Sequence, residues 1–212
     1  MARIEINQSA FAGDRRAAEE NRMLLRERGW TAVNMIGSPG SGKTTLLLHA
    51  LPRLNRPSAV VAGDVEGSFD AERLRAAGIA AAQIETHGSC HLTARLVREQ
   101  LLGLALPAGA LIVIENVGNL VCPAFFDLGE NFTLAVLSAA EGHEKPLKYP
   151  AVFRRANAVA ITKCELTGVC RFDTVAAKAA ALLQNPESCV IELSAHEGIG
   201  MERFIGQLEI WK

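Results

Sequence analysis

Cys90 and His91 stand side by side in the stretch ETHGSCHLTARLV, where a loop is expected to enter a helix. A further cysteine, Cys122, follows an apolar run in NLVCPAFFDLGE. Thiolate sulfur and imidazole nitrogen are donors that suit Zn²⁺ or Ni²⁺. Two adjacent residues bind one ion only when other ligands join them, and Cys122 and a second subunit are the candidates. The alternative is structural, with a buried thiol at Cys90 and a helix-capping imidazole at His91.

The stretch GSPGSGKT at 37–44 matches the phosphate-binding pattern G-x-x-x-x-G-K-S/T at every position. Its glycines let backbone N–H groups turn toward phosphates, and its lysine offers a point charge to them. A β-rich run precedes the pattern and a helix-like run follows it, which is the context that a phosphate loop needs. The residues predicted to bind the phosphates are Gly37, Gly40, Ser41, Gly42, Lys43, Thr44 and Thr45.

Two acidic residues end apolar runs that are typical of buried strands, Asp64 in SAVVAGD and Glu115 in LIVIE. Ligands of parallel sheets bind beyond the carboxyl ends of the strands, so both carboxylates should face the phosphate loop. We predict Thr44, Asp64 and Glu115 as Mg²⁺ ligands, and Lys43, Asp64 and Glu115 as catalytic residues. Gly118 follows closely enough for its amide to contact a γ-phosphate. The alternative for both acids is a solvated strand end.

The stretch AITKCEL stands where a guanine-binding protein has the pattern N-K-x-D after a strand. Lys163 is kept, Thr162 replaces the asparagine and Glu165 replaces the aspartate. A glutamate can still accept hydrogen bonds from guanine N1 and N2, whereas threonine cannot make the asparagine's contact. Ser194 and Ala195 in LSAHEGIG are predicted to present backbone to guanine O6. We therefore expect a preference for guanine over adenine that is weaker than that of an N-K-x-D protein.

The elements that position these residues alternate between strand and helix. This order is typical of βαβ units and predicts a P-loop NTPase fold of the α/β class, with a mostly parallel, doubly wound sheet and helices on both faces. We expect one P-loop GTPase domain over residues 1–212, with an N-terminal helix at about 10–29. Strands are expected at 31–37, 58–64, 110–116, 132–140, 157–163 and 188–194, and further helices at 43–54, 69–78, 91–104, 148–156, 172–184 and 200–211.

Composition excludes several classes of protein. The net charge of −1 over 212 residues gives no basic field for nucleic acid. No apolar run reaches the roughly 18 residues of a membrane helix, and the first residues lack a secretory apolar segment. The five cysteines are odd in number, and a chain of 212 residues is too long to need a disulfide framework. We expect a cytoplasmic protein with no nucleic-acid or membrane partner.

Three stretches resemble one family: GSCHLTA, IENVGNLVCPAFFDLGE and EGHEKPLKYP. They are similar to the HypB family, the nickel-incorporation GTPases of nickel–iron hydrogenase maturation, and the resemblance runs from about residue 8 to 212. It implies a GTP-hydrolysing metallochaperone of the dimerising P-loop class, with GTP or GDP, Mg²⁺, and Ni²⁺ or Zn²⁺ bound through Cys90, His91 and Cys122. It also implies delivery to the hydrogenase large subunit beside another nickel-delivery accessory protein. The stretch TKCE departs from the family's N-K-x-D.

The stretch EKPLKYP holds two lysines, Lys145 and Lys148, close to Pro146 and Pro150. Lys148 is predicted to reach a nucleotide across a homodimer that GTP or metal promotes, and the alternative is a solvated lysine in a turn. Two other functions stay open at this stage. One is a P-loop kinase for a small molecule, and the other is a slow nucleotide-dependent dimerisation module with little turnover.

Overall fold

The computed structural model describes the backbone of residues 2–212 and the side chains of residues 13–212. Within them, seven strands form one sheet in the order β3-β2-β4-β1-β5-β6-β7, and every neighbouring pair is parallel. The strands are β1 (Thr31–Gly37), β2 (Ser58–Asp64), β3 (Ala80–Glu85), β4 (Leu111–Glu115), β5 (Phe132–Ser138), β6 (Ala158–Thr162) and β7 (Cys189–Glu192).

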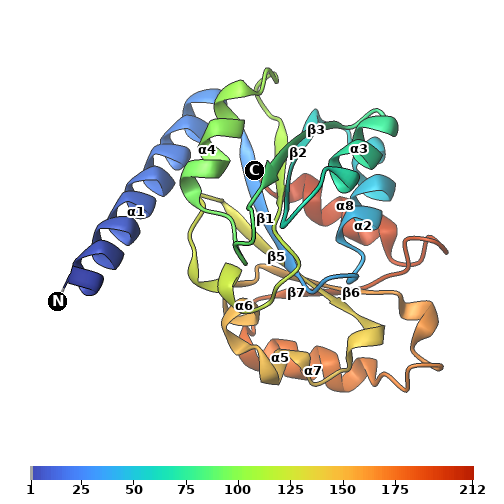
Figure 1. Cartoon of the computed structure of the whole chain (residues 1–212). Coiled ribbons are helices and arrows are strands. Elements are labelled where there is room, and N and C mark those ends of the chain that lie inside the picture. Colours follow the sequence, from blue (N-terminus) through green and yellow to red (C-terminus); the bar gives the residue numbers. More distant parts are fainter. Residues whose placement is uncertain (1) are drawn as a thin grey trace.

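Helices cover both faces of this sheet (Figure 1). The α-helices are α1 (Ala2–Arg28), α2 (Lys43–Ala50), α3 (Phe69–Ala76), α4 (Ala94–Gly103), α5 (Lys145–Lys148), α6 (Pro150–Arg155), α7 (Thr174–Gln184) and α8 (Met201–Ile210). Short 3₁₀ helices are η1 (Leu51–Arg53), η2 (Cys122–Phe125), η3 (Ala139–Glu141) and η4 (Cys164–Leu166). Side chains of α2, α3 and α8 pack on one face, and those of α1, α4, α6 and α7 pack on the other.

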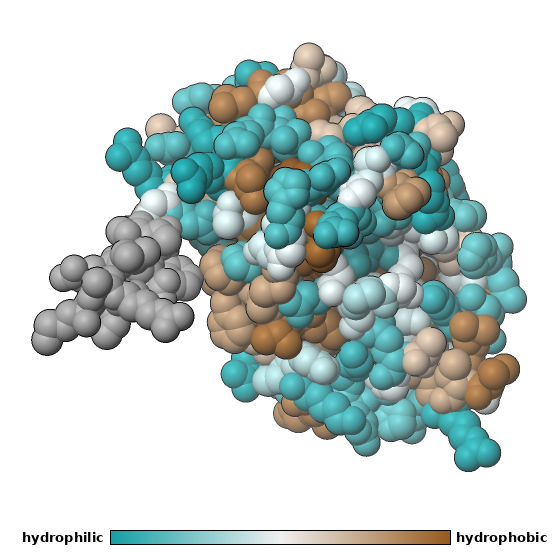
Figure 2. Space-filling view, in the orientation of Figure 1, coloured by the Kyte–Doolittle hydropathy of each residue, from teal (hydrophilic) through white to brown (hydrophobic). Residues whose placement is uncertain are grey.

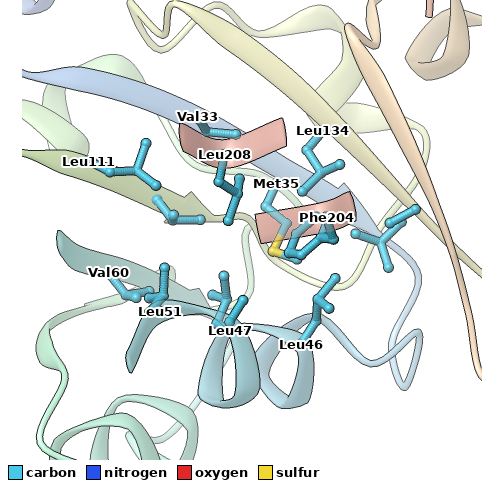
Figure 3. Close-up of a cluster of buried hydrophobic side chains, with 14 of the residues drawn as sticks. Val33, Met35, Leu46, Leu47, Leu51, Val60, Leu111, Leu134, Phe204 and Leu208 are labelled. Atoms are coloured by element: carbon cyan, nitrogen blue, oxygen red, sulfur yellow. The ribbon is translucent and has the colours of Figure 1, made fainter. Parts of the chain in front are cut away.

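The core follows from the two-residue period of the strands. Val33 and Met35 of β1 point to the face covered by α2 and α8, whereas Ala32 points to the opposite face. Figure 3 shows the first cluster, in which Leu47 of α2 and Phe204 of α8 meet these strand side chains. Both faces of the central strands are therefore buried, which is why their sequences read as continuous apolar runs.

The predicted fold class is confirmed, and the sheet of the described residues is wholly parallel rather than mostly parallel. The prediction missed β3, an edge strand of sequence AAAQIE in which only Ile84 is buried. Alanine, glutamine and glutamate have weak strand preference, so the segment gave no signal. The N-terminal helix begins at Ala2 instead of about residue 10.

Two further predicted helices differ from the structure in their bounds. The helix expected at 91–104 begins at Ala94, because the Thr93 hydroxyl caps it by accepting the N–H of Leu96. Cys90 and His91 therefore lie in the loop before the helix. The helix expected at 148–156 is two short helices, α5 and α6, which meet at Tyr149 where the backbone leaves the helical region.

The coloured part of the face shown in Figure 2 is mostly hydrophilic, with separate apolar patches. No helix in the described part of the chain is long and apolar enough to cross a membrane.

Candidate functional site

The loop between β1 and α2 has the conformation that a phosphate cradle needs. Gly40 and Gly42 have φ of 70° and 93°, a region that suits glycine. A Cβ at Gly37 would lie 2.7 Å from the Ser41 hydroxyl, so this glycine makes a close approach. The Lys43 ammonium is buried and donates to the carbonyls of Gly37 and Ser38, each at 3.3 Å. Burial lowers the pKa of Lys43, although nearby carboxylates such as Glu115 act in the opposite direction.

Oxygen ligands suited to a magnesium ion meet beside this loop. The Thr44 hydroxyl donates to Glu115 Oε1 at 2.8 Å. Glu115 Oε2 is buried and has no hydrogen-bond partner among the residues that the structure describes. Burial raises the pKa of Glu115 to about 7, against the lowering effects of Lys43 and Thr44. Asp64 lines the same cavity of about 530 Å³. A buried carboxylate with free lone pairs beside a hydroxyl fits Mg²⁺.

Gly118 brings the next loop against the phosphate loop. A Cβ at Gly118 would lie 2.8 Å from the Pro39 ring, so the two backbones touch. Gly118 also lines the cavity that holds Lys43 and Glu115. The loop after β4 therefore faces whatever occupies the phosphate end of the cavity.

A second cavity, of about 280 Å³, adjoins the first at Gly42, Thr45, Lys163 and His196, which line both. Lys163 and Glu165 line it together with Ala195. Glu165 Oε2 is buried and accepts no hydrogen bond from any described residue. The unsatisfied carboxylate oxygen in this apolar slot needs a hydrogen-bond donor. Guanine offers donors at N1 and N2, whereas adenine N1 is an acceptor.

Two residues of β6 and the turn after it brace the phosphate loop. The Thr162 hydroxyl donates to the Ser41 carbonyl at 2.6 Å, and the Lys163 ammonium donates to the Gly40 carbonyl at 2.8 Å. Lys163 is held in the left-handed region with φ of 59°. The lining of the second cavity and the phosphate loop are thus tied together within the chain.

Ser194 and Lys148 lie elsewhere. Ser194 is fully buried outside both cavities, and its hydroxyl accepts the N–H of Glu197 at 3.1 Å. Lys148 is exposed and pairs with Glu144 at 2.6 Å, which raises the pKa of the lysine. Within one chain, Lys148 does not line either cavity.

The structure brings the cysteine–histidine pair next to Cys122. Cys90 Sγ lies 3.6 Å from His91 Nδ1. A hydrogen bond with the Cys122 side chain raises the pKa of the Cys90 thiol, and burial adds to this effect. The His91 ring stacks on Phe126 with 3.6 Å between centroids, and burial lowers its pKa. In the described part of the chain, however, no three such residues form a ready-made metal group.

Comparison with known proteins gives the family. Residues 31–190 match the model described as CobW/HypB/UreG, nucleotide-binding domain. The Escherichia coli K12 hydrogenase maturation factor HypB is 42% identical over 208 residues, which cover 97% of this chain and 72% of that protein. The chain belongs to the HypB family.

Two solved HypB structures share the fold over nearly the whole chain. HypB from Archaeoglobus fulgidus is 40% identical with a TM-score of 0.87, covering 93% of this chain and 97% of the other. HypB from Helicobacter pylori, solved in complex with nickel, is 35% identical with a TM-score of 0.88, covering 92% and 93%. The predicted resemblance to the HypB family is thereby confirmed.

Sequence reasoning missed several residues of this HypB-family site. Lys145, rather than Lys148, approaches the phosphate loop of its own chain, with its ammonium 3.4 Å from the Ser38 hydroxyl. Asp70 and Arg73 at the start of α3 line the larger cavity. The loop after β2 carries α3 to the edge of this cavity, and no local sequence motif marks the two residues. His196 lines both cavities, and its position beside the S-A stretch was the one usable signal.

Proposed function

We propose that this chain is a GTP-hydrolysing metallochaperone that holds nickel at Cys90, His91 and Cys122 and delivers it during hydrogenase maturation. The observation that supports this most is the contact between the Cys90 and Cys122 thiols in a HypB-family chain. Soft thiolates with an imidazole suit Ni²⁺, and also Zn²⁺. The nickel named for the Helicobacter pylori structure favours nickel as the cargo.

Hydrolysis adds a water to the γ-phosphorus and breaks its bond to the bridging oxygen, giving GDP and phosphate. Lys43 places a positive charge against the phosphates, and the Gly118 amide meets the γ-phosphate. Thr44, Asp64 and Glu115 would hold Mg²⁺, which would supply positive charge against the transferring group. Glu115 and Asp64 line the same cavity, so they are also the carboxylates that would orient the attacking water.

Guanine is the proposed base because Glu165 has an unsatisfied buried oxygen in the second cavity. The carboxylate accepts from N1–H and the N2 amino group of guanine. Adenine presents an acceptor at N1, which the carboxylate repels. Ala195 presents backbone toward the base, and the buried Ser194 supports that turn.

A homodimer completes the metal site in this proposal. Each chain offers only pairwise contacts among its three ligands, whereas two chains related by a two-fold axis offer each Cys90–His91 pair its symmetry mate. The exposed Lys148 is free to reach the partner's nucleotide once its pair with Glu144 opens. GTP and metal would each promote this dimer, and the hydrogenase large subunit and an accessory protein are the proposed partners.

The test measures free phosphate over several turnovers with GTP and Mg²⁺, and titrates Ni²⁺ in parallel while the mass is followed. Phosphate release with nickel binding supports the proposal. A phosphorylated small molecule in place of free phosphate would instead indicate a kinase. Nucleotide-dependent dimerisation with no turnover would indicate a module that binds partners without hydrolysis.

A further inference from the structure

A buried chain of polar side chains joins the loop after β4 to both segments that hold the proposed metal ligands. Asn116, which is 1% exposed, accepts the N–H of Val117 at 3.0 Å and the N–H of Leu92 at 3.4 Å on its carboxamide oxygen. Its Nδ2 donates to Asn34 Oδ1 at 3.1 Å. Asn34 Nδ2 in turn donates to Glu130 Oε1 at 3.2 Å. Neither asparagine is explained by the nucleotide chemistry.

Glu130, at one end of this chain of side chains, fixes which group donates and which accepts in each hydrogen bond. Glu130 accepts the N–H of Leu128 and a guanidinium N–H of Arg155, so it is held as an acceptor. A carboxylate cannot donate, so Asn34 must turn its NH₂ group toward Glu130 and its oxygen toward Asn116. Asn116 must then turn its NH₂ group toward Asn34 and its oxygen toward the two backbone amides. Each carboxamide therefore has one orientation that satisfies its neighbours.

One end of the chain reaches the Cys90–His91 segment. The Leu92 amide that Asn116 holds belongs to the residue directly after His91. Asn119, in the same loop as Gly118, donates to the Cys90 carbonyl at 3.0 Å. The loop after β4 thus binds the backbone on both sides of His91.

The other end reaches Cys122. Arg155 bonds Glu130 through one nitrogen and the Ala124 carbonyl of η2 through another, at 3.2 and 2.8 Å. Cys122 begins that short helix. Both halves of the proposed metal site are therefore attached to one polar chain whose centre lies beside the phosphate cavity.

The same carboxamide also sets the loop that faces the nucleotide. Asn116 lines the larger cavity, follows Glu115 directly, and binds its own neighbour Val117. Gly118, the next residue, touches Pro39 of the phosphate loop. A shift of the 116–118 backbone must change the hydrogen bond from Leu92, because one oxygen serves both amides.

We propose that Asn116 is the positioning residue through which the nucleotide state changes nickel affinity at Cys90, His91 and Cys122. The inference rests on the proposed function and specifies its regulation. Asn116 binds no nickel itself. It sets the distance between the nucleotide-facing loop and the Cys–His segment, while Asn34 and Glu130 hold its orientation.

The test compares Ni²⁺ affinity with GDP and with a non-hydrolysable GTP analogue, followed by thiolate-to-nickel absorption. In the native protein the two affinities should differ by about fivefold or more, the usual lower range of coupling between sites. In Asn116→Leu this ratio should fall below about twofold. The affinity with GDP should stay within about threefold of native, because all three ligands remain. Simple loosening of the metal site would weaken both affinities together and leave the ratio intact.

Asn185→Leu is the control for loss of a bonded carboxamide: it removes two hydrogen bonds, to the Ala156 carbonyl and from the Glu187 amide, where Asn116→Leu removes three, and it lies outside both sites. Its ratio should remain native. If Asn116→Leu does not fold, Asn116→Ser replaces it, because the shorter hydroxyl cannot reach both amides and Asn34. A native ratio in the Asn116 variant, or equal affinities in the native protein, overturns the inference while GTP turnover and nickel binding still support the function. A native protein that binds no nickel overturns both.

Discussion

Replacing Glu165 by alanine should weaken GTP binding much more than ATP binding. The side chain lines the smaller cavity, and its Oε2 has no hydrogen-bond partner within the described chain. Guanine offers two N–H donors at this position, whereas adenine offers an acceptor at N1. The loss is therefore specific to one base.

The size of the effect follows from the charge of the acceptor. A hydrogen bond to a charged group has a net value of roughly 1.5–3 kcal/mol. Losing about 2 kcal/mol corresponds to a Kd for GTP that rises about 30-fold. ATP affinity should change by less than about threefold or improve, because the variant removes a carboxylate that repels adenine N1. The nucleotide-free protein should be no less stable than native, since the variant also removes an unsatisfied buried oxygen.

Isothermal titration with GDP and ADP measures this without interference from turnover. Glu165→Gln is the matched control, because it keeps the shape and one acceptor but adds a donor that opposes the guanine edge. Glu165→Asp should keep part of the preference, since it retains the carboxylate on a shorter stem. Equal losses for the two nucleotides in Glu165→Ala would show that this residue does not read the base.

Three further variants test the remaining parts of the site. Lys43→Ala should abolish GTP hydrolysis and leave the melting temperature of the nucleotide-free protein nearly unchanged, because Lys43 contributes only two long bonds to its own loop; normal turnover in this variant would refute the phosphate-loop assignment. Cys122→Ala should weaken nickel binding at least about tenfold while the Kd for GDP stays native. Calorimetric titration of each ligand measures this, and an equal loss of GDP affinity would contradict a role limited to the metal. Glu115→Gln should flatten the pH dependence of stability without Mg²⁺. The folded-state pKa of Glu115 is raised from 4.5 to about 7, so the folded protein keeps a proton that the unfolded chain has lost, and native stability should fall as pH rises through this window. Denaturant unfolding at several pH values in this range measures the free energy of unfolding of both proteins. If the variant's free energy depends on pH as steeply as that of the native protein, the reasoning is wrong.

The sequence predicted best where a local rule links residue type to position in the sheet. The phosphate loop follows a strand and opens a helix, and Asp64 and Glu115 end parallel strands, so their meeting at one edge followed from sheet geometry alone. β3 was not predicted, because an alanine-rich edge strand has little alternation of apolar and polar residues.

Contacts between side chains that are distant in sequence could not be predicted in this way. Nothing local distinguishes Lys145 from Lys148, yet Lys145 reaches Ser38 whereas Lys148 pairs with Glu144. The chain of Asn34, Asn116 and Glu130 joins residues of different elements, and its asparagines sit within or beside apolar strands where they look like isolated polar substitutions. Their burial is understood only when their partners are seen.

The bond from Thr162 to the phosphate loop joins the stretch proposed to read the base to the stretch proposed to hold the phosphates. The residue that replaces the asparagine of N-K-x-D makes its hydrogen bond to the Ser41 carbonyl, and Lys163 holds the carbonyl before it. Substitutions in the TKCE stretch would therefore change the shape of the phosphate loop as well as the proposed base preference. Selection for a different base would then pass through variants that also bind the phosphates of any nucleotide differently. Fewer substitutions in this segment would therefore keep nucleotide affinity.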